Sequence, residues 1–285
     1  MEKAMNLKSL FGLEGKNVVI TGAGSGMGYS ATKLLYELGA NIYASIRNNP
    51  LDIPVHREIK ADLGQPEGLE LFGSEMPDEV EALFLCHGIA DAPGNANALS
   101  VNLTNFFGYK TLTEALLPRI ADGGSVTFIS SAGGHGWRDS IAACRGVISC
   151  NSWDAAVAWY ENHPDDTVRG YVFSKECQHV YVMSKVHAPE FIDRKIRLNA
   201  LAPGNTLTGL TDAFNKSIDG DAQSGKAIIE GIFLSSWNGR WASKEEMGHP
   251  LVVMGSRICS YMSGQIIYFD YGMSSVWEYE DLEET

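Results

Sequence analysis

The sequence of 285 residues is poor in cysteine and in basic residues, and it has no long apolar run. No stretch reaches the roughly 18 consecutive apolar residues of a membrane span, and residues 1–8 lack the apolar core of a signal peptide. The five cysteines are scattered without CxxC spacing, which argues against a disulfide framework and a zinc site. A net charge of −13 opposes binding to nucleic acid. We therefore expect a cytoplasmic protein without a metal, a nucleic-acid partner or a membrane partner.

Glycine, in contrast, is concentrated where a β-branched run over 18–20 turns into a segment with helical periodicity. The turn holds Gly22, Gly26 and Gly28, and Gly39 follows as a helix stop. Glycines at such a turn let a pyrophosphate approach the backbone at the N-terminus of the helix. A tight turn without any ligand would give the same pattern, so the rest of the chain has to decide. The candidate phosphate contacts are Gly22, Ser25, Gly26, Met27 and Gly28.

Short apolar runs and helix-patterned segments alternate along the chain. This alternation predicts an α/β fold with a doubly wound parallel sheet, in a single domain over residues 1–285. Ligands of such sheets gather at the carboxyl ends of the strands, and Gly22, Gly88 and Ser131 all fall at strand ends. The expected strands cover 18–20, 41–46, a run ending near 62, 82–86, 125–129 and 195–201.

The end of the second expected strand bears on the choice of cofactor. In dinucleotide-binding units that select NAD, a carboxylate near this point contacts the adenosine ribose, whereas an arginine accommodates the 2′-phosphate of NADP. This chain has Ile46 and Arg47 there, so no carboxylate stands at these positions to repel a phosphate. An arginine that is simply exposed to solvent is the alternative. The sequence therefore favours NADP(H) over NAD(H).

Two Tyr-x-x-x-Lys pairs lie close together, and each puts a phenol and an ammonium on one face of a helix. Tyr171 and Lys175 leave about twenty residues before the strand at 195–201, enough for a helix that crosses back along the sheet. Tyr181 and Lys185 leave about ten, so the first pair is preferred and Tyr181 is interpreted as a packing residue. A cation beside a phenol favours the ionised form, so we expect Lys175 to lower the pKa of Tyr171.

Together these features resemble the short-chain dehydrogenase/reductase family, and the resemblance covers nearly the whole chain. The pattern is closest to the bacterial 3α-hydroxysteroid dehydrogenase/carbonyl reductase group, which has a comparable insertion. The motifs that carry the resemblance are Leu13-Glu14-Gly15-Lys16, Thr21 to Gly28, Asp62-Leu63, Cys86-His87-Gly88, Asn102, Ser130-Ser131, Tyr171 to Lys175, Arg197-Leu198-Asn199, Pro203-Gly204 and Gly264-Gln265.

The resemblance implies a catalytic tetrad. Tyr171 would act as the acid and base, and Lys175 would lower its pKa and hold the nicotinamide ribose. Ser131 would orient the substrate carbonyl, and Asn102 would anchor a proton-relay water. The further cofactor contacts that the resemblance implies are Asp62, Leu63, Gly88, Pro203, Gly204, Thr206 and Thr208.

The chain departs from the family pattern mainly in the long stretch between Ser131 and Tyr171, an insertion of about 133–168. Ser152 and the alanines that follow it predict an extra helix in this insertion. A second stretch, residues 206–240, combines Gly, Ser and Asp with apolar islands, as expected of a lid over a substrate.

Two further features lie in the last third of the chain. Trp237 and Trp241 are candidate substrate contacts, although packing is the more frequent role of such residues. The acidic residues of 278–285 predict a solvated, flexible tail.

The sequence thus predicts an oxidoreductase that moves a hydride between NADP(H) and a secondary alcohol or ketone, with a hydroxysteroid or another cyclic ketone as candidate substrate. The resemblance also implies a homo-oligomer, either a dimer or a tetramer. A non-catalytic dinucleotide-sensing or scaffold protein of the same fold is the alternative, and the paired Tyr171 and Lys175 argue against it. An epimerase or dehydratase is disfavoured by the glycine spacing and by the lack of a long C-terminal substrate domain.

Overall fold

A computed structural model describes residues 7–284 apart from 92–95, 210 and 235–238. The strands are β1 (Asn17–Ile20), β2 (Asn41–Ile46), β3 (Arg57–Lys60), β4 (Val80–Leu85), β5 (Ile120–Ile129), β6 (Arg197–Pro203) and β7 (Ile266–Phe269). The α-helices are α1 (Leu7–Phe11), α2 (Gly26–Glu37), α3 (Pro66–Ser74), α4 (Ala98–Asn102), α5 (Gly108–Leu116), α6 (Ile141–Ile148), α7 (Trp153–Asn162), α8 (Pro164–Thr167), α9 (Gly170–Lys185), α10 (Pro189–Ile192), α11 (Thr211–Asp219), α12 (Ala222–Ile229), α13 (Glu245–Gly255) and α14 (Met273–Glu284).

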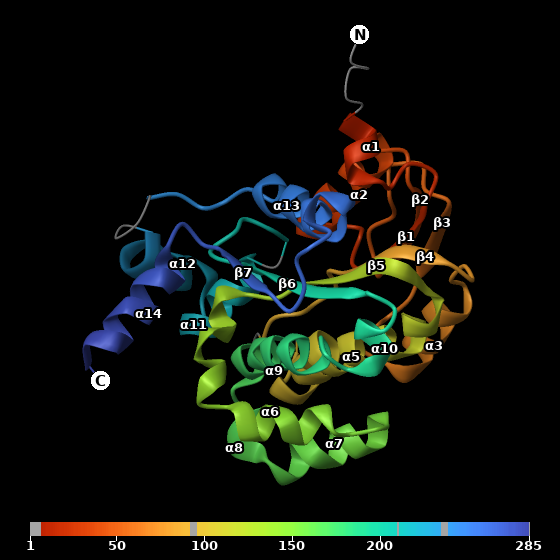
Figure 1. The fold of residues 1–285 in the computed structure, drawn as a ribbon. Helices are drawn as coiled ribbons and strands as arrows, with labels where there is room; N and C mark the ends of the chain where they lie inside the picture. The colour runs from red at the N-terminus through yellow and green to blue at the C-terminus, as the bar shows by residue number, and fades with distance from the viewer. Residues whose placement is uncertain (1–6, 92–95, 210, 235–238, 285) are drawn as a thin grey trace.

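The seven strands form one parallel sheet in the order β3-β2-β1-β4-β5-β6-β7, with helices on both faces (Figure 1). This arrangement confirms the predicted single-domain α/β fold with a doubly wound parallel sheet. The order reverses between β1 and β4, which is where such folds bind their ligands.

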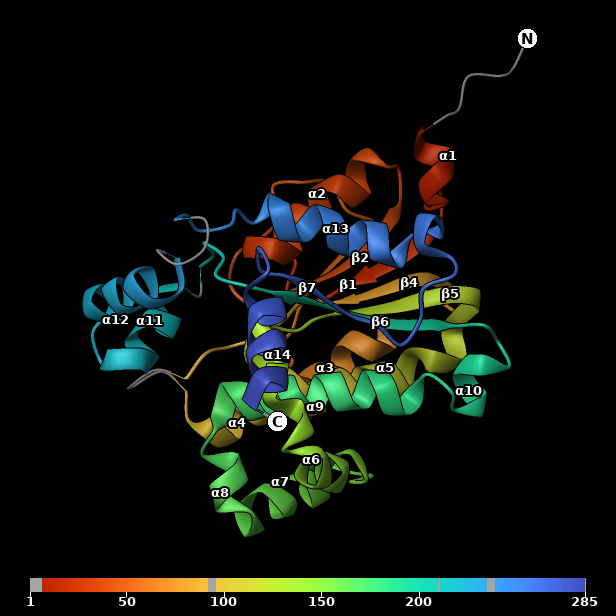
Figure 2. The same ribbon diagram turned by 60° about the vertical axis from the view of Figure 1, so that its left-hand side comes forward.

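The sheet separates two apolar cores. Helices α2 and α13 cover one face, and α3, α5 and α9 cover the other (Figures 1 and 2). Successive strand residues point to opposite faces, so Val18 and Ile20 pack with Leu35 and Leu251 in one core while Val19 enters the other. Burial on both faces explains why the strand is a continuous apolar run rather than an alternating one.

The insertion between β5 and α9 adds a further layer. It begins with the 3₁₀ turn η3 (Ala132–Arg138) and continues as α6, α7 and α8, which lie outside α9 (Figure 1). The Trp159 ring stacks on Phe173 of α9 at 6.0 Å, and Trp153 meets the edge of Phe107 at 5.7 Å. The Ser152 side chain caps α7, so the predicted inserted helix is confirmed. This layer shields α9 from solvent.

The predicted lid contains α11, α12 and the π-helical turn η4 (Glu230–Leu234), which form a lobe beside the sheet (Figure 2). Trp237 lies outside the described residues. The described part of the acidic tail, predicted to be solvated and flexible, belongs to α14 and is exposed at residues 278–280. The Glu278 carboxylate lies 3.1 Å from Arg138 Nη2 at the end of η3.

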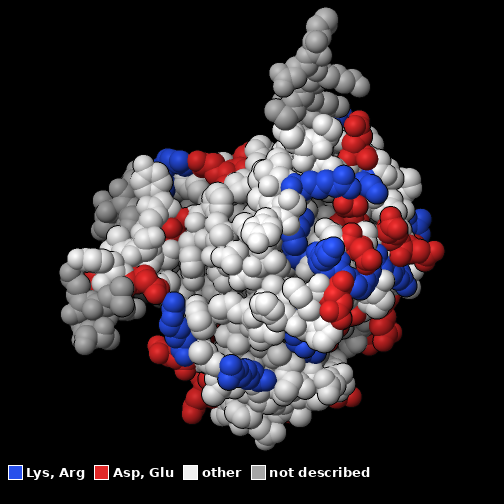
Figure 3. Space-filling model, in the orientation of Figure 1, with Lys and Arg blue, Asp and Glu red and all other residues white. Residues whose placement is uncertain are grey.

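Charges are mixed on the surface. On the face drawn in Figure 3, lysines and arginines lie among carboxylates rather than forming one basic surface. Within the described ranges, no helix is long and apolar enough to cross a membrane. A cytoplasmic location stays a prediction.

Candidate active site

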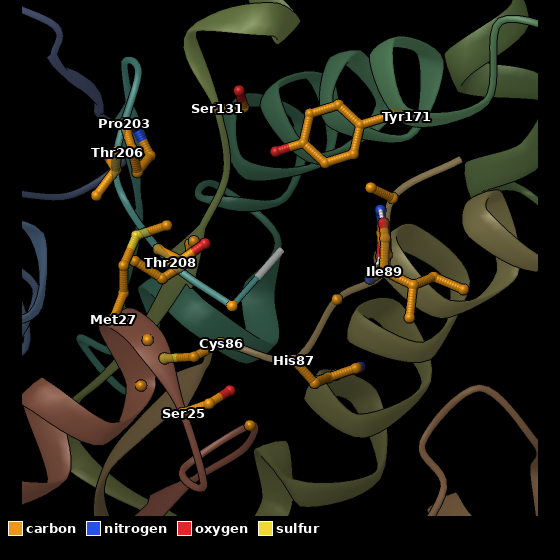
Figure 4. Close-up of a pocket in the computed structure, with 18 of the residues that line it drawn as sticks. Ser25, Met27, Cys86, His87, Ile89, Ser131, Tyr171, Pro203, Thr206 and Thr208 are labelled. Atoms are coloured by element: carbon orange, nitrogen blue, oxygen red, sulfur yellow. Dashed lines mark hydrogen bonds between the residues drawn. The ribbon is translucent and has the colours of Figure 1, made fainter. Parts of the chain in front are cut away.

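A cavity of about 600 Å³ is lined by residues at the carboxyl ends of β1, β2, β4 and β5. Figure 4 shows Ser25 and Met27 of the glycine turn at one end of the view, and Ser131 and Tyr171 at the other. The predicted site residues that line the cavity are Gly22, Ser25, Gly26, Met27, Gly28, Arg47, Asp62, Leu63, Gly88, Ser131, Tyr171, Lys175, Pro203, Gly204, Thr206 and Thr208. Asn102 is the predicted site residue that does not line it.

The glycine turn after β1 has the shape of a phosphate cradle. Gly22 adopts a φ of +64° and Gly26 a φ of +55°, in the left-handed region that favours glycine. A Cβ on Gly22 would lie 2.7 Å from the His87 backbone nitrogen, and a Cβ on Gly28 would lie 2.3 Å from the Gly22 carbonyl oxygen. Helix α2 then begins at Gly26, so the first turn of a helix lines the cavity. A pyrophosphate fits this combination of close backbone approach and free helical N–H groups.

The end of β2 brings Ile46 and Arg47 to the same cavity. The Ile46 side chain is buried, while Arg47 is exposed to solvent. No carboxylate occurs among the lining residues 45–49. Asp62, just after β3, also lines the cavity, and its Oδ1 accepts a hydrogen bond from the Gly64 N–H at 3.1 Å. A phosphate group bound at the end of β2 would therefore lie beside the cationic side chain of Arg47, and no carboxylate among residues 45–49 would repel it.

Tyr171, Ser131 and Lys175 meet at the beginning of α9. Tyr171 and Lys175 lie one helical turn apart on α9, and Ser131 follows β5. The Tyr171 and Ser131 hydroxyls lie on the same side of the cavity in Figure 4. Lys175 Nζ lies 5.4 Å from the centre of the Tyr171 ring and donates to the Ile129 carbonyl at 3.0 Å. The structure thus brings a phenol, a hydroxyl and an amine to one part of the cavity.

Burial controls the protonation of these groups in the protein without cofactor. Desolvation raises the pKa of Tyr171, and the hydrogen bond with Ser131 opposes this rise. Desolvation also lowers the pKa of Lys175 to about 7. The expected fall in the Tyr171 pKa is therefore not found, because burial disfavours both the phenolate and the ammonium. Tyr171 is a protonated phenol at neutral pH, which is the form that can donate a proton.

Comparison with known proteins identifies the family. Residues 169–274 match a family model described as enoyl-(acyl carrier protein) reductase. Coniferyl-alcohol dehydrogenase of Pseudomonas sp. (strain HR199 / DSM 7063) is 33% identical over 203 residues, which cover 71% of this chain and 77% of that relative. The chain belongs to the short-chain dehydrogenase/reductase family. It is therefore an oxidoreductase, of a family that binds a nicotinamide dinucleotide cofactor.

Other members of the family cover almost the full length. The 2-dehydro-3-deoxy-D-gluconate 5-dehydrogenase of Bacillus subtilis (strain 168) is 25% identical over 288 aligned positions, covering 94% of this chain and 98% of the relative. The crystal structure of a 3α-hydroxysteroid dehydrogenase from Pseudomonas sp. B-0831, complexed with NADH, aligns with a TM-score of 0.74 at 22% identity. That alignment covers 93% of this chain and 99% of the solved chain, and it shows the shared fold.

The structure corrects the placement of Asn102. Its side chain donates to the carbonyls of Ala98 at 2.9 Å and Thr167 at 3.0 Å, and it does not line the cavity. Asn105 lines the cavity instead, with Oδ1 accepting from the Ile89 N–H at 2.9 Å and Nδ2 donating to the Ile89 carbonyl at 2.8 Å. A π-helical turn, η1 (Leu103–Phe107), contains Asn105 and changes which residues face inward. The helical period of the sequence does not reveal this turn, so Asn105 was missed.

A second missed residue is Asp91, which holds the N-terminus of α9. Its Oδ2 accepts a hydrogen bond from the Tyr171 N–H at 2.9 Å. Gly170 allows this approach, because its φ is +43° and a Cβ there would lie 2.4 Å from the Asp91 carboxylate. The carboxylate caps the positive end of the helix next to the phenol. The two residues are 80 positions apart, so no local sequence pattern reveals the contact.

Apolar side chains from α9, α11, α12 and α14, together with Trp241, also line the cavity. These residues are Val172, Ile218, Ile229, Trp241, Met273 and Trp277. Helix α14 is fixed by Glu278, whose carboxylate also lies 3.3 Å from His135 Nε2. Trp241 is fixed by a hydrogen bond from Nε1 to Glu230 at 3.0 Å. Residues of α11, α12 and α14 therefore form an apolar wall of the cavity.

Proposed function

We propose that the protein is an alcohol dehydrogenase/carbonyl reductase that moves a hydride between NADP(H) and a secondary alcohol or ketone. The observation that carries the proposal is the meeting of Tyr171, Ser131 and Lys175 in the dinucleotide cavity, with the phenol protonated. The residues that would hold the nicotinamide side are Pro203, Gly204, Thr206 and Thr208, which line the same cavity.

The protein's own residues manage the substrate oxygen and the proton, while the cofactor supplies the hydride when it is bound. In the reducing direction, the hydroxyls of Ser131 and Tyr171 donate hydrogen bonds to the carbonyl oxygen, where negative charge develops. Tyr171 Oη then gives its proton to that oxygen, which forms the alcohol and leaves a phenolate. Ser131 and the Lys175 ammonium, 5.4 Å from the ring centre, stabilise this phenolate until it takes up a proton again.

We propose an uncharged substrate with an apolar ring system, such as a hydroxysteroid or another cyclic ketone. The charged side chains among the described lining residues are Arg47, Asp62 and Lys175, and the lid and α14 contribute apolar side chains. An apolar wall with few polar groups selects a ligand by its carbon skeleton. The relative named for coniferyl alcohol supports an alcohol as the substrate class.

A panel of ketones followed by NADPH absorbance tests the substrate class. We expect kcat/KM for uncharged steroid or cyclic ketones to exceed that for a keto acid such as 2-dehydro-3-deoxy-D-gluconate at least about tenfold, because a buried unpaired carboxylate is costly. The reverse order would contradict the proposed substrate. A protein that binds NADPH but reduces no carbonyl would support the sensing alternative.

The preference for NADP(H) rests on Arg47, which lies at the strand end where the 2′-phosphate would bind. A charge-assisted contact to the phosphate contributes about 1.5–3 kcal/mol, or roughly 10- to 100-fold in kcat/KM. Arg47→Asp should remove this gain and favour NAD(H). The matched control is Arg145→Asp, which changes another exposed arginine outside the cavity and should leave the preference intact. Equal kcat/KM for the two cofactors in the unmutated protein would contradict this prediction.

We also propose a homo-oligomer. Members of the family pair subunits through the helices that correspond to α5 and α9, and here α6, α7 and α8 lie over that region (Figure 1). We therefore expect the subunits to meet through another face. Light scattering of the full chain at micromolar concentration should give a dimer or tetramer, and a monomer would contradict the proposal.

A further inference from the structure

Gln178 is a buried polar side chain on α9, three residues after Lys175. It is 0% exposed, so its carboxamide must find partners inside the protein. Both the Nε2 and the Oε1 atom of the carboxamide have a hydrogen-bond partner. Gln178 Nε2 donates to the backbone carbonyl of Asn105 at 2.6 Å, and Gln178 Oε1 accepts from Lys175 Nζ at 3.4 Å. A single side chain therefore connects the amine of Lys175 to the π-helical turn η1.

These contacts complete a chain of hydrogen bonds around the reacting end of the cavity. Asn105 holds the backbone of Ile89 with its side chain, while its own carbonyl receives Gln178. Lys175 extends the chain to the Ile129 carbonyl at the end of β5. The Gln178 carboxamide thus links α9 to the turn η1. Asn105 extends this link to the loop after β4, and Lys175 extends it to the end of β5.

The described titratable groups that face Lys175 carry no charge at pH 7, so only uncharged hydrogen-bond acceptors among its described neighbours stabilise its ammonium form. The titratable groups that face it from the surrounding elements are Cys86, His87, Tyr109, Tyr171 and His179. Burial lowers the pKa of both histidines to about 3 and raises the pKa values of the thiol and the phenols, so all five are neutral at pH 7. The Ile129 carbonyl and Gln178 Oε1 therefore stabilise the ammonium against the cost of burial.

We propose that Gln178 is a positioning residue for Lys175, because its carboxamide ties the ammonium directly to the backbone of Asn105. The family resemblance implies a proton-relay water at Asn102, whereas Asn105 is the asparagine that lines the cavity. An amide neither gains nor loses a proton at ordinary pH, so the Gln178 bridge positions the ammonium without passing a proton to Asn105. This inference rests on the proposed function, in which Lys175 stabilises the Tyr171 phenolate.

The test is the pH profile of ketone reduction in Gln178→Met, which keeps the length of the side chain but removes both hydrogen bonds. Gln178 Oε1 favours the charged form of Lys175, so its loss lowers the pKa of Lys175. The decline of kcat/KM with rising pH should then begin at a lower pH than in the unmutated protein, by up to about one pH unit.

Two further variants make the result specific. Gln178→Glu retains an oxygen acceptor in either protonation state, so its decline should begin at or above the wild-type pH. Tyr181→Phe is the matched control, because Tyr181 is also fully buried on α9 but does not contact Lys175. Its decline should begin at the wild-type pH.

A change in kcat/KM of Gln178→Met that depends on pH indicates a positioning role, whereas a change that is the same at every pH indicates a loss of packing. A Gln178→Met variant with kcat/KM reduced by the same factor at every pH would overturn the inference, as would a Gln178→Glu decline that moves to lower pH. Failure of the proposed function is seen separately, as a wild-type protein that reduces no ketone. In that case the same three variants are compared by the pH dependence of NADPH binding, measured by NADPH fluorescence. The same order of midpoints is expected, and an unchanged midpoint in Gln178→Met would overturn the inference.

Discussion

The two asparagines of the α4–η1 segment provide a sharp test, because the sequence favours Asn102 and the structure favours Asn105. Asn105→Ala removes two hydrogen bonds to the Ile89 backbone, of 2.9 Å and 2.8 Å. Each lost bond leaves a half-buried backbone group without its partner, at about 1 kcal/mol or more, so the free energy of unfolding should fall by about 2–4 kcal/mol. Asn102→Ala also removes two hydrogen bonds, to Ala98 and Thr167, and should destabilise the protein by a similar amount.

Activity should nevertheless separate the two variants. Ile89 lines the cavity, so its displacement in Asn105→Ala misplaces the ligand and should lower kcat/KM about 10- to 100-fold. Asn102 does not line the cavity, so Asn102→Ala should stay within a few-fold of the unmutated protein. Urea unfolding gives the stability of each variant, and NADPH absorbance at a temperature where both are folded gives the rate. Loss of turnover in Asn102→Ala with full turnover in Asn105→Ala would refute this reasoning.

Two further predictions concern stability. Asp91→Ala removes the cap on α9 and should lower the free energy of unfolding, measured in urea, by about 1–2 kcal/mol, whereas Asp91→Asn keeps an oxygen acceptor and should lose less; equal losses would contradict a cap that acts by hydrogen bonding. His179 is buried, and burial lowers its pKa to about 3. Its contribution to the free energy of unfolding is therefore fully present above the unfolded-state pKa of about 6.5. This contribution is lost as the pH falls toward 3. His179→Leu should therefore have a smaller difference in urea midpoint between pH 7 and pH 4 than the unmutated protein, and an unchanged difference would argue against the buried neutral imidazole.

Much of the fold could be predicted because its signals are local. The apolar run before Gly22 and the positive φ of that glycine follow from sequence patterns that depend on neighbouring residues. The choice of Tyr171 over Tyr181 followed from the length of chain that the crossover needs. In the structure Tyr171 lines the cavity, while the Tyr181 ring stacks on Phe128 in the core at 6.0 Å.

The missed features depend on contacts between distant residues or on irregular helix geometry. The π-helical turn moves Asn105 to the cavity, and a regular helical period points to other positions. The Asp91 cap joins segments that only the fold brings together. The ion pair of Glu278 with Arg138 likewise joins residues that are 140 positions apart. The pKa of Tyr171 depends on burial, which the sequence of α9 alone does not show.

The measurement that tests the central claim most directly compares Tyr171→Phe with Tyr181→Phe in ketone reduction by NADPH. Tyr171→Phe keeps the ring and removes the proton donor, so kcat/KM should fall by about 10²–10⁴ while NADPH affinity stays within a few-fold. Tyr181→Phe removes a hydroxyl buried in the core and should keep kcat/KM within a few-fold. Turnover that survives in Tyr171→Phe, or is abolished in Tyr181→Phe while NADPH still binds, would contradict the assignment of Tyr171 as the acid.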